Sequence, residues 1–208
     1  KGSSTQDYPS SLMGSIALLR QTYLDAQWYA QTTNREMDIS LAAWNANKGL
    51  PQIFEVGDYR SALRADQIAK EFGVNYILKG GGDEYKRVEE IRKTGSSFII
   101  PLNFPKAYDI TNPFDALNVS LGEMRHWELA PANAVMLHNA GVRFAFTTDG
   151  LKEKKEFSAA LIKAIKCGLS KEAALSALTT VPASLLGCTD KLGALRSGML
   201  ANFFICTK

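Results

Sequence analysis

Residues 51–101, "PQIFEVGDYRSALRADQIAKEFGVNYILKGGGDEYKRVEEIRKTGSSFIIP", repeat one pattern. The apolar runs at 51–56, 74–80 and 96–101 are typical of short buried strands. The segments between them, 58–73 and 83–95, have helical composition and end at glycine. Strands that alternate in this way with helices of about 10 to 15 residues indicate βαβ units around a parallel sheet.

The same alternation extends beyond this stretch. Helices are predicted before it, over 10–31 with Ser10 or Ser11 as N-cap and over 39–49 with Gly49 as the C-terminal stop. Residues 101–127 hold several prolines and are predicted to form a long loop. The remaining predictions are a helix over 130–141, a strand over 142–148, helices over 153–167, 170–179 and 181–187, and a final strand over 201–206. An open doubly wound sheet and a TIM barrel both satisfy this order, and both place their sites at the C-terminal ends of the strands.

The composition is that of an ordinary globular protein. The 208 residues are 46% hydrophobic and 22% charged, with a net charge of +3. The absence of a basic stripe with interleaved aromatics argues against nucleic acid as a partner, and no apolar run approaches a membrane span. Cys167, Cys188 and Cys206 are widely spaced and form no CxxC, so we interpret them as small core residues.

Polar residues follow several of the predicted strands and are the first candidates for a site. Glu55 is either a ligand or acid–base group, or the partner of Lys79 in an ion pair. Asp149, in "TTDG", is either a metal ligand or base, or the N-cap of the next helix. His126 is the one histidine predicted in a loop, where it is either a substrate contact or a structural residue.

The glycine-rich segment 79–86, "KGGGDEYK", stands between a strand and a helix, where backbone N–H groups can cradle phosphate. It lacks GxGxxG and the GK[ST] ending of a P-loop. A tight turn in which Asp83 caps the following helix is the preferred interpretation.

Four stretches together resemble the amidohydrolase superfamily, in particular its imidazolonepropionase-like branch. They are "YPSSLMGSIALLRQTYLDAQWY" (8–29), "ADQIAKEFGVNYILKGGGDEYKRVEEIRKTG" (65–95), "ELAPANAVMLHNAGVRFAFTTDG" (128–150) and "SKEAALSALTTVPASLLGCTDKLGALRSGMLANFFI" (170–205). The resemblance implies an α/β fold, namely the C-terminal half of a TIM-type (β/α)8 barrel. It implies one domain over 1–200 and the start of a small β-sandwich strand over 201–208.

The resemblance also implies a chemistry. The family hydrolyses C–N and related bonds with a water activated by one or two divalent metals, usually zinc. Its eighth-strand aspartate, both metal ligand and base, falls on Asp149, and its fifth-strand histidine falls on Glu55. Its sixth-strand histidine falls on Gly80, and the HxH of its first strand has no counterpart.

Two functions follow from this pattern. One is a hydrolase of amide- or lactam-type C–N bonds, with Asp149 and Glu55 as catalytic residues, Asp149 as metal ligand, and His126 and Lys79 in contact with a small-molecule substrate. The alternative is a catalytically inactive amidohydrolase-like module for binding or scaffolding within a larger protein. The unpaired edges of a half barrel predict association with the missing N-terminal half or with a second copy of the chain. The resemblance further suggests a periplasmic or secreted protein of a Gram-negative bacterium.

Overall fold

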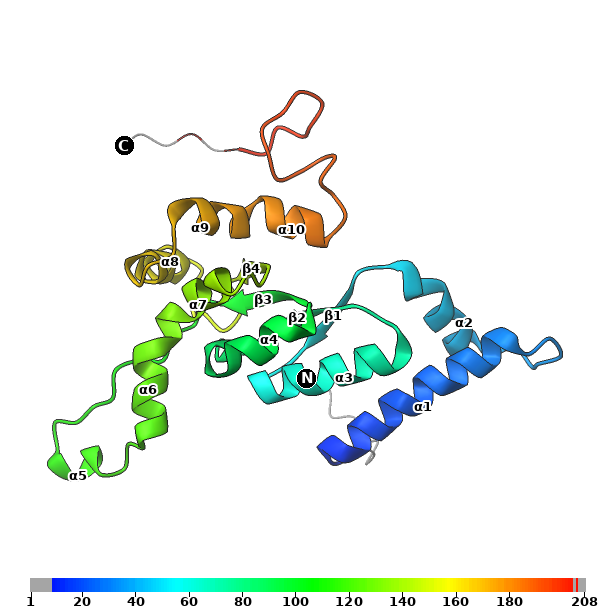
Figure 1. Ribbon diagram of the computed structural model, residues 1–208, viewed down its shortest axis with the longest axis horizontal. Coiled ribbons are helices and arrows are strands. Elements are labelled where there is room, and N and C mark those ends of the chain that lie inside the picture. Colours follow the sequence, from blue (N-terminus) through cyan, green and yellow to red (C-terminus); the bar gives the residue numbers. More distant parts are fainter. Residues whose placement is uncertain (1–8, 204, 206–208) are drawn as a thin grey trace.

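The fold is built on a sheet of parallel strands. The computed structural model describes residues 9–203 and 205. The strands are β1 (Gln52–Glu55), β2 (Tyr76–Lys79), β3 (Ser97–Pro101) and β4 (Phe144–Thr147), and they lie in the order β1-β2-β3-β4 (Figure 1). Each neighbouring pair is parallel. The predicted βαβ units are therefore confirmed, and the strictly sequential order is that of part of a TIM-type barrel rather than of a doubly wound sheet.

Helices connect the strands and extend the fold beyond them. They are α1 (Leu12–Gln31), α2 (Ile39–Ala46), α3 (Tyr59–Phe72), α4 (Val88–Thr94), α5 (Pro113–Ala116), α6 (Leu121–Leu129), α7 (Asn133–Asn139), α8 (Glu156–Lys166), α9 (Lys171–Leu178) and α10 (Thr180–Leu185), with short 3₁₀ turns at Asn47–Gly49, Glu84–Arg87 and Ala130–Ala132. Figure 1 shows α1 and α2 side by side at one end of the molecule, α5 and α6 toward the opposite end, and α9 and α10 beside the β4 edge of the sheet. None of the helices within 9–203 is long and apolar enough to cross a membrane.

Local signals account for many helix ends. Ser11 caps α1 by accepting a hydrogen bond from the backbone N–H of Gly14 at 3.1 Å. Helices α3 and α4 end at Gly73 and Gly95, with φ of 66° and 72°. These are left-handed conformations that glycine adopts without a steric penalty, so the predicted glycine stops are confirmed.

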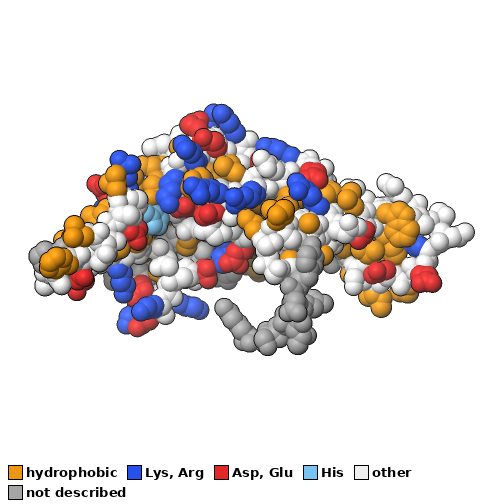
Figure 2. All heavy atoms as spheres, turned by 90° about the horizontal axis from the view of Figure 1, so that it is seen from below, with side chains coloured by type: hydrophobic (Ala, Val, Ile, Leu, Met, Phe, Trp, Pro, Cys, Tyr) orange, Lys and Arg blue, Asp and Glu red, His pale blue; other side chains and the backbone are white. Residues whose placement is uncertain are grey.

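The two faces of the sheet differ. Tyr76, Leu78, Phe98 and Ile100 are at most 5% exposed and pack in the main hydrophobic core. The alternate residues lie on the other face, where Ile53 is 51% exposed. In a closed barrel such residues fill the interior, so the described chain leaves one side of the barrel core open. Charged side chains of both signs are interspersed on the molecular face shown in Figure 2.

Several expectations are corrected. The predicted loop 101–127 contains α5 and most of α6, because Asn112 caps α5 and Ser120 forms a capping box with Glu123. Gly49 lies in a 3₁₀ turn rather than ending α2, whose C-cap is Asn47.

Two further expectations concern the cysteines and the end of the chain. Cys167 is exposed rather than part of the core, and Cys206 lies outside the described residues. No strand is assigned at 201–203 or 205, and 204 and 206–208 also lie outside the described residues. The sandwich strand over 201–208 therefore stays a prediction.

Candidate functional site

Three charged side chains meet at the C-terminal ends of the strands. The Lys79 Nζ lies 2.9 Å from Glu55 Oε1 and 2.9 Å from Asp149 Oδ2. Glu55 and Lys79 are paired neighbours in β1 and β2, so their contact follows from the register. Asp149 follows β4, which is separated from β2 by β3, so Lys79 reaches across one strand. We call Glu55, Lys79 and Asp149 the strand-end triad; its Glu55–Lys79 pair confirms the ion pair considered from the sequence.

The contacts within the triad favour the charged forms of Lys79 and Asp149. The Lys79 side chain is 22% exposed, whereas those of Glu55 and Asp149 are 73% and 60% exposed. The hydrogen bond from Lys79, and then its charge, lowers the pKa of Asp149. The hydrogen bonds to Asp149 and then to Glu55 raise the pKa of Lys79. The Lys79 ammonium thus lies between the carboxyl groups of Glu55 and Asp149, and its pairing with Asp149 stabilises the charged form of both partners.

The turn after β4 positions Asp149. Its backbone N–H donates to Thr147 Oγ1 at 3.2 Å, and Gly150 has a φ of 78°. A Cβ at Gly150 would lie 2.6 Å from Asn103 Nδ2, so Asn103 packs directly against this turn. The alternative that Asp149 caps the next helix is wrong, because α8 begins only at Glu156 and has no side-chain cap. The sequence contained no pattern that singled out Asn103.

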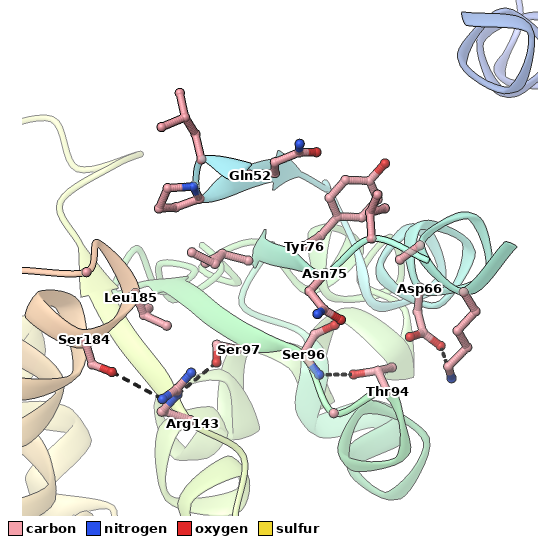
Figure 3. A pocket seen from close by; sticks show the side chains of 18 of the residues that line it. Gln52, Asp66, Asn75, Tyr76, Thr94, Ser96, Ser97, Arg143, Ser184 and Leu185 are labelled. Atoms are coloured by element: carbon pink, nitrogen blue, oxygen red, sulfur yellow. Dashed lines mark hydrogen bonds and ion pairs between the residues drawn. The ribbon is translucent and has the colours of Figure 1, made fainter. Parts of the chain in front are cut away.

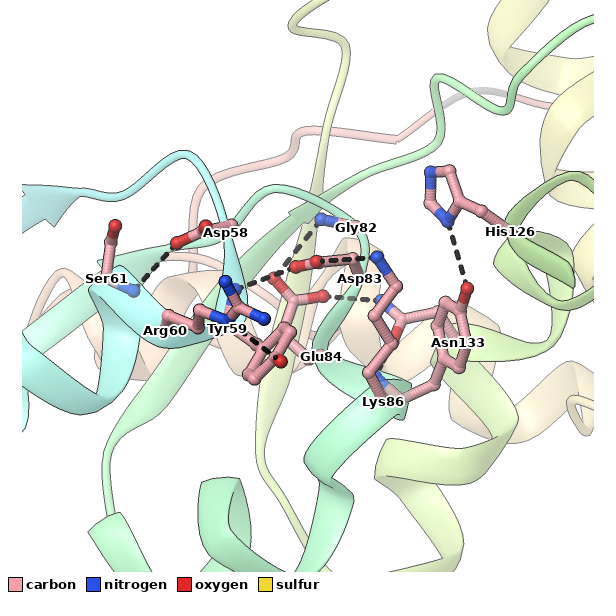
Figure 4. Close-up of polar contacts among 11 residues, drawn as sticks. Asp58, Tyr59, Arg60, Ser61, Gly82, Asp83, Glu84, Lys86, His126 and Asn133 are labelled. Atoms are coloured by element: carbon pink, nitrogen blue, oxygen red, sulfur yellow. Dashed lines mark hydrogen bonds and ion pairs between the residues drawn. The ribbon is translucent and has the colours of Figure 1, made fainter. Parts of the chain in front are cut away.

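The glycine-rich loop after β2 is closely packed. Figure 4 shows one of its residues, Gly82, bound to Glu84. A Cβ at Gly80 would lie 2.0 Å from Glu84 Oε1, and one at Gly81 would lie 2.2 Å from the Gly57 carbonyl oxygen. These glycines therefore allow close approach of neighbouring groups, and no anion cradle is needed to explain them.

Glu84, which the sequence interpretation missed, lies beneath this loop. It is 0% exposed, and its carboxylate accepts hydrogen bonds from Asn133 Nδ2 at 2.7 Å and from the Gly82 N–H at 3.2 Å. Burial raises the pKa of Glu84. A single glutamate in a charged segment has no sequence signal for burial, because its hydrogen-bond partner Asn133 lies 49 residues away.

Asp83 does not cap the helix that follows it. Its Oδ1 accepts from the backbone N–H of Tyr59 at 2.8 Å, and its Oδ2 pairs with Lys86 at 3.1 Å. Asp83 and Asp58, the N-cap of α3, therefore both accept hydrogen bonds from backbone N–H groups in the first turn of α3. The predicted cap was wrong because the Asp83 side chain is directed to Tyr59 and Lys86, and no backbone N–H of the 3₁₀ turn Glu84–Arg87 donates to it.

His126 lies in α6 rather than in a loop, and it belongs to a separate group of residues. Its Nδ1 is 3.0 Å from the hydroxyl of Tyr85, a contact drawn as the dashed line at His126 in Figure 4. The two rings stack with centroids 6.0 Å apart. Burial, and then the charge of Lys86, lowers the pKa of His126. No hydrogen bond or ion pair within 9–203 joins His126 to the strand-end triad, so its role as a substrate contact stays a prediction.

The donor set does not fit the zinc site that the resemblance implies. Within 9–203 and 205, no group of three His, Cys, Asp or Glu side chains could hold a metal ion. Both carboxylates of the triad already pair with Lys79. At Gly80 the Glu84 carboxylate fills the space that a histidine side chain would need. A zinc site needs three protein ligands, and the described residues do not supply them.

Comparison with known proteins extends these observations. Residues 129–208 match the model of the Amidohydrolase family. A crystal structure of an amidohydrolase from Thermotoga maritima matches with a TM-score of 0.72 and 21% identity, over 93% of this chain and 50% of that one. A second amidohydrolase crystal structure matches with a TM-score of 0.53 and 20% identity, over 78% of this chain and 39% of that one. The chain thus spans half or less of these structures, and no curated protein matches it.

Proposed function

We propose, from the premise that this chain belongs to the amidohydrolase superfamily, that it contributes part of a hydrolase acting on C–N bonds. The substrate class is a small molecule with an amide- or lactam-type bond, taken from the resemblance to the imidazolonepropionase-like branch. The strand-end triad carries the proposal, because it places two carboxylates and an ammonium together at the end of the strands where TIM-type barrels hold their active sites.

In this proposal Lys79 binds the carbonyl oxygen of the scissile bond. An ammonium has three N–H donors, and its carboxylate partners in the described chain account for two of them. The third can donate to a substrate oxygen and stabilise the negative charge that develops there. Glu55 keeps Lys79 protonated and oriented while this happens.

Asp149 acts on the attacking water. Its carboxylate accepts a proton as the water oxygen bonds to the carbonyl carbon, and it returns that proton to the nitrogen as the C–N bond breaks. The products are a carboxylic acid and an amine. No step passes through a metal, because the described donor set does not form a metal site.

A specific observation favours the second candidate, a binding or scaffolding module. The lowered pKa of Asp149 makes it a weak base, whereas a general base works best with a pKa near the working pH. In this case the triad would recognise a polar ligand without transforming it.

The unpaired sheet edges support a proposal about partners. Within the described chain β1 pairs only with β2, and β4 only with β3. We propose that further strands, from the rest of a barrel or from a second copy, pair with these edges. A periplasmic or secreted location remains a proposal from resemblance.

The test uses the intact protein, purified without chelator, and a panel of amides and lactams. We expect Asp149→Asn to lower kcat/KM by about 100-fold or more, while the matched control Asp115→Asn, on exposed α5, leaves it unchanged. No turnover of any compound by the wild type would favour the binding module. Stoichiometric metal, measured by mass spectrometry and lost in Asp149→Asn, would overturn the metal-free step.

A further inference from the structure

A polar cavity lies at the opposite end of the sheet from the strand-end triad. Its volume is about 690 Å³, and its lining includes Gln52 and Ser97 at the starts of β1 and β3 and Arg143 just before β4. Figure 3 shows Ser96, Ser97, Asn75 and Arg143 around this space. The N-terminal ends of barrel strands are remote from the reaction end, so this cavity is separate from the site proposed above.

Arg143 is the distinctive group in this cavity. Its Nε donates to Ser97 Oγ at 2.9 Å and its Nη1 to Ser184 Oγ at 3.4 Å. Both partners are neutral hydroxyls. Across the described residues, no carboxylate lies within ion-pair distance of Arg143, so its positive charge is not compensated there.

The one acidic side chain in the lining does not neutralise Arg143. Asp66 pairs with Lys70, 2.7 Å away, and this pair has no net charge. Figure 3 shows Asp66 and Arg143 at opposite ends of the cavity. The part of the cavity around Arg143 therefore presents a cation and hydroxyl groups.

We propose that this cavity binds a small oxyanion, a phosphate or carboxylate group, with Arg143 as the charge partner. A guanidinium has five N–H donors in a planar fork that matches such groups, and only two of them are directed to Ser97 and Ser184. The hydroxyls of these serines can rotate to donate to the anion while their oxygens keep accepting from Arg143. The proposal does not depend on the hydrolase function.

The test measures binding of inorganic phosphate and, separately, of succinate to the full chain by NMR titration at fixed ionic strength. Arg143→Gln should weaken binding at least tenfold, and Arg143→Lys should weaken it less. The matched control is Arg92→Gln, which removes the same charge from an exposed arginine on α4 that pairs with Glu89. It should change affinity less than twofold.

The outcomes separate the possibilities. Binding of phosphate alone, of succinate alone or of both supports the site and identifies the group it accepts. Absence of binding of either anion to the wild type, or equal loss in Arg143→Gln and Arg92→Gln, overturns the proposal. Ser184→Ala removes the hydroxyl that accepts a hydrogen bond from Arg143 Nη1 and leaves the charge of Arg143 in place. This variant gives a second readout and should weaken anion binding.

Discussion

Substitution of Gly80 by alanine should destabilise the protein through Glu84. The added Cβ would lie 2.0 Å from Glu84 Oε1 and 2.9 Å from its Cδ, far inside van der Waals contact. Glu84 cannot move into solvent, because it is 0% exposed and bound by Asn133 and the Gly82 N–H. Overpacking of this kind costs about 1–3 kcal/mol, and displacement of the buried carboxylate from its donors costs about 1–3 kcal/mol more. The expected loss is therefore roughly 2–6 kcal/mol.

A double-mutant cycle tests the cause. Free energies of unfolding are measured by urea denaturation for the wild type, Gly80→Ala, Glu84→Ala and the double variant. Glu84→Ala alone leaves Asn133 Nδ2 and the Gly82 N–H without their carboxylate and should cost about 1–3 kcal/mol. In the double variant the clash is gone, so its loss should fall short of the sum by at least about 1 kcal/mol.

The control is Gly49→Ala, since a Cβ at Gly49 would have no atom within 4 Å. It should change the free energy of unfolding by less than about 0.5 kcal/mol. The reasoning fails if Gly80→Ala changes the free energy of unfolding no more than Gly49→Ala does. It also fails if the losses of Gly80→Ala and Glu84→Ala sum to the loss of the double variant within about 0.5 kcal/mol.

Three further predictions concern titration. Lys79→Met should raise the pKa of Asp149 toward its ordinary 3.8, followed by NMR of the carboxyl carbon; an unchanged pKa would contradict the ion pair. The raised pKa of Glu84 stabilises the wild type while Glu84 is protonated, and the wild type loses this stabilisation as the pH rises from 4.5 through the folded pKa. Glu84→Gln does not titrate, so its free energy of unfolding should rise relative to that of the wild type over the same pH range. Urea unfolding from pH 4 to 8 measures this difference, and a constant difference would refute it. Lys86→Met should raise the pKa of His126, because it removes a nearby cation and frees the carboxylate of Asp83. The pKa is followed by NMR of the imidazole protons, and a fall in the pKa would contradict this reasoning.

Much of the fold could be predicted because its signals are local. The apolar runs and the glycine stops act within a few residues, so the parallel strands and the ends of α3 and α4 followed from the sequence. The predicted loop over 101–127 failed for a related reason. Its prolines hid a helix start, which the capping pair Ser120 and Glu123 specifies.

The candidate site was predicted only in part. Its positions at strand ends were visible, since parallel strands bring their C-terminal ends to one edge, and the Glu55–Lys79 pair follows from neighbouring strands. The pairing of Lys79 with Asp149 was not visible, because it crosses β3. The proton chemistry of the triad depends on that contact.

The sequence by itself determined the alternation of strands and helices, the glycine stops and the presence of polar residues at the strand ends. Only the tertiary structure decided that Asp83 serves α3, that Glu84 is buried against Gly80, and that Arg143 has no carboxylate partner in the described chain. The physical reason is the separation along the sequence over which each interaction acts. Backbone propensities and caps act between residues a few positions apart, whereas burial and charge pairing depend on which distant segments the sheet and its helices bring together.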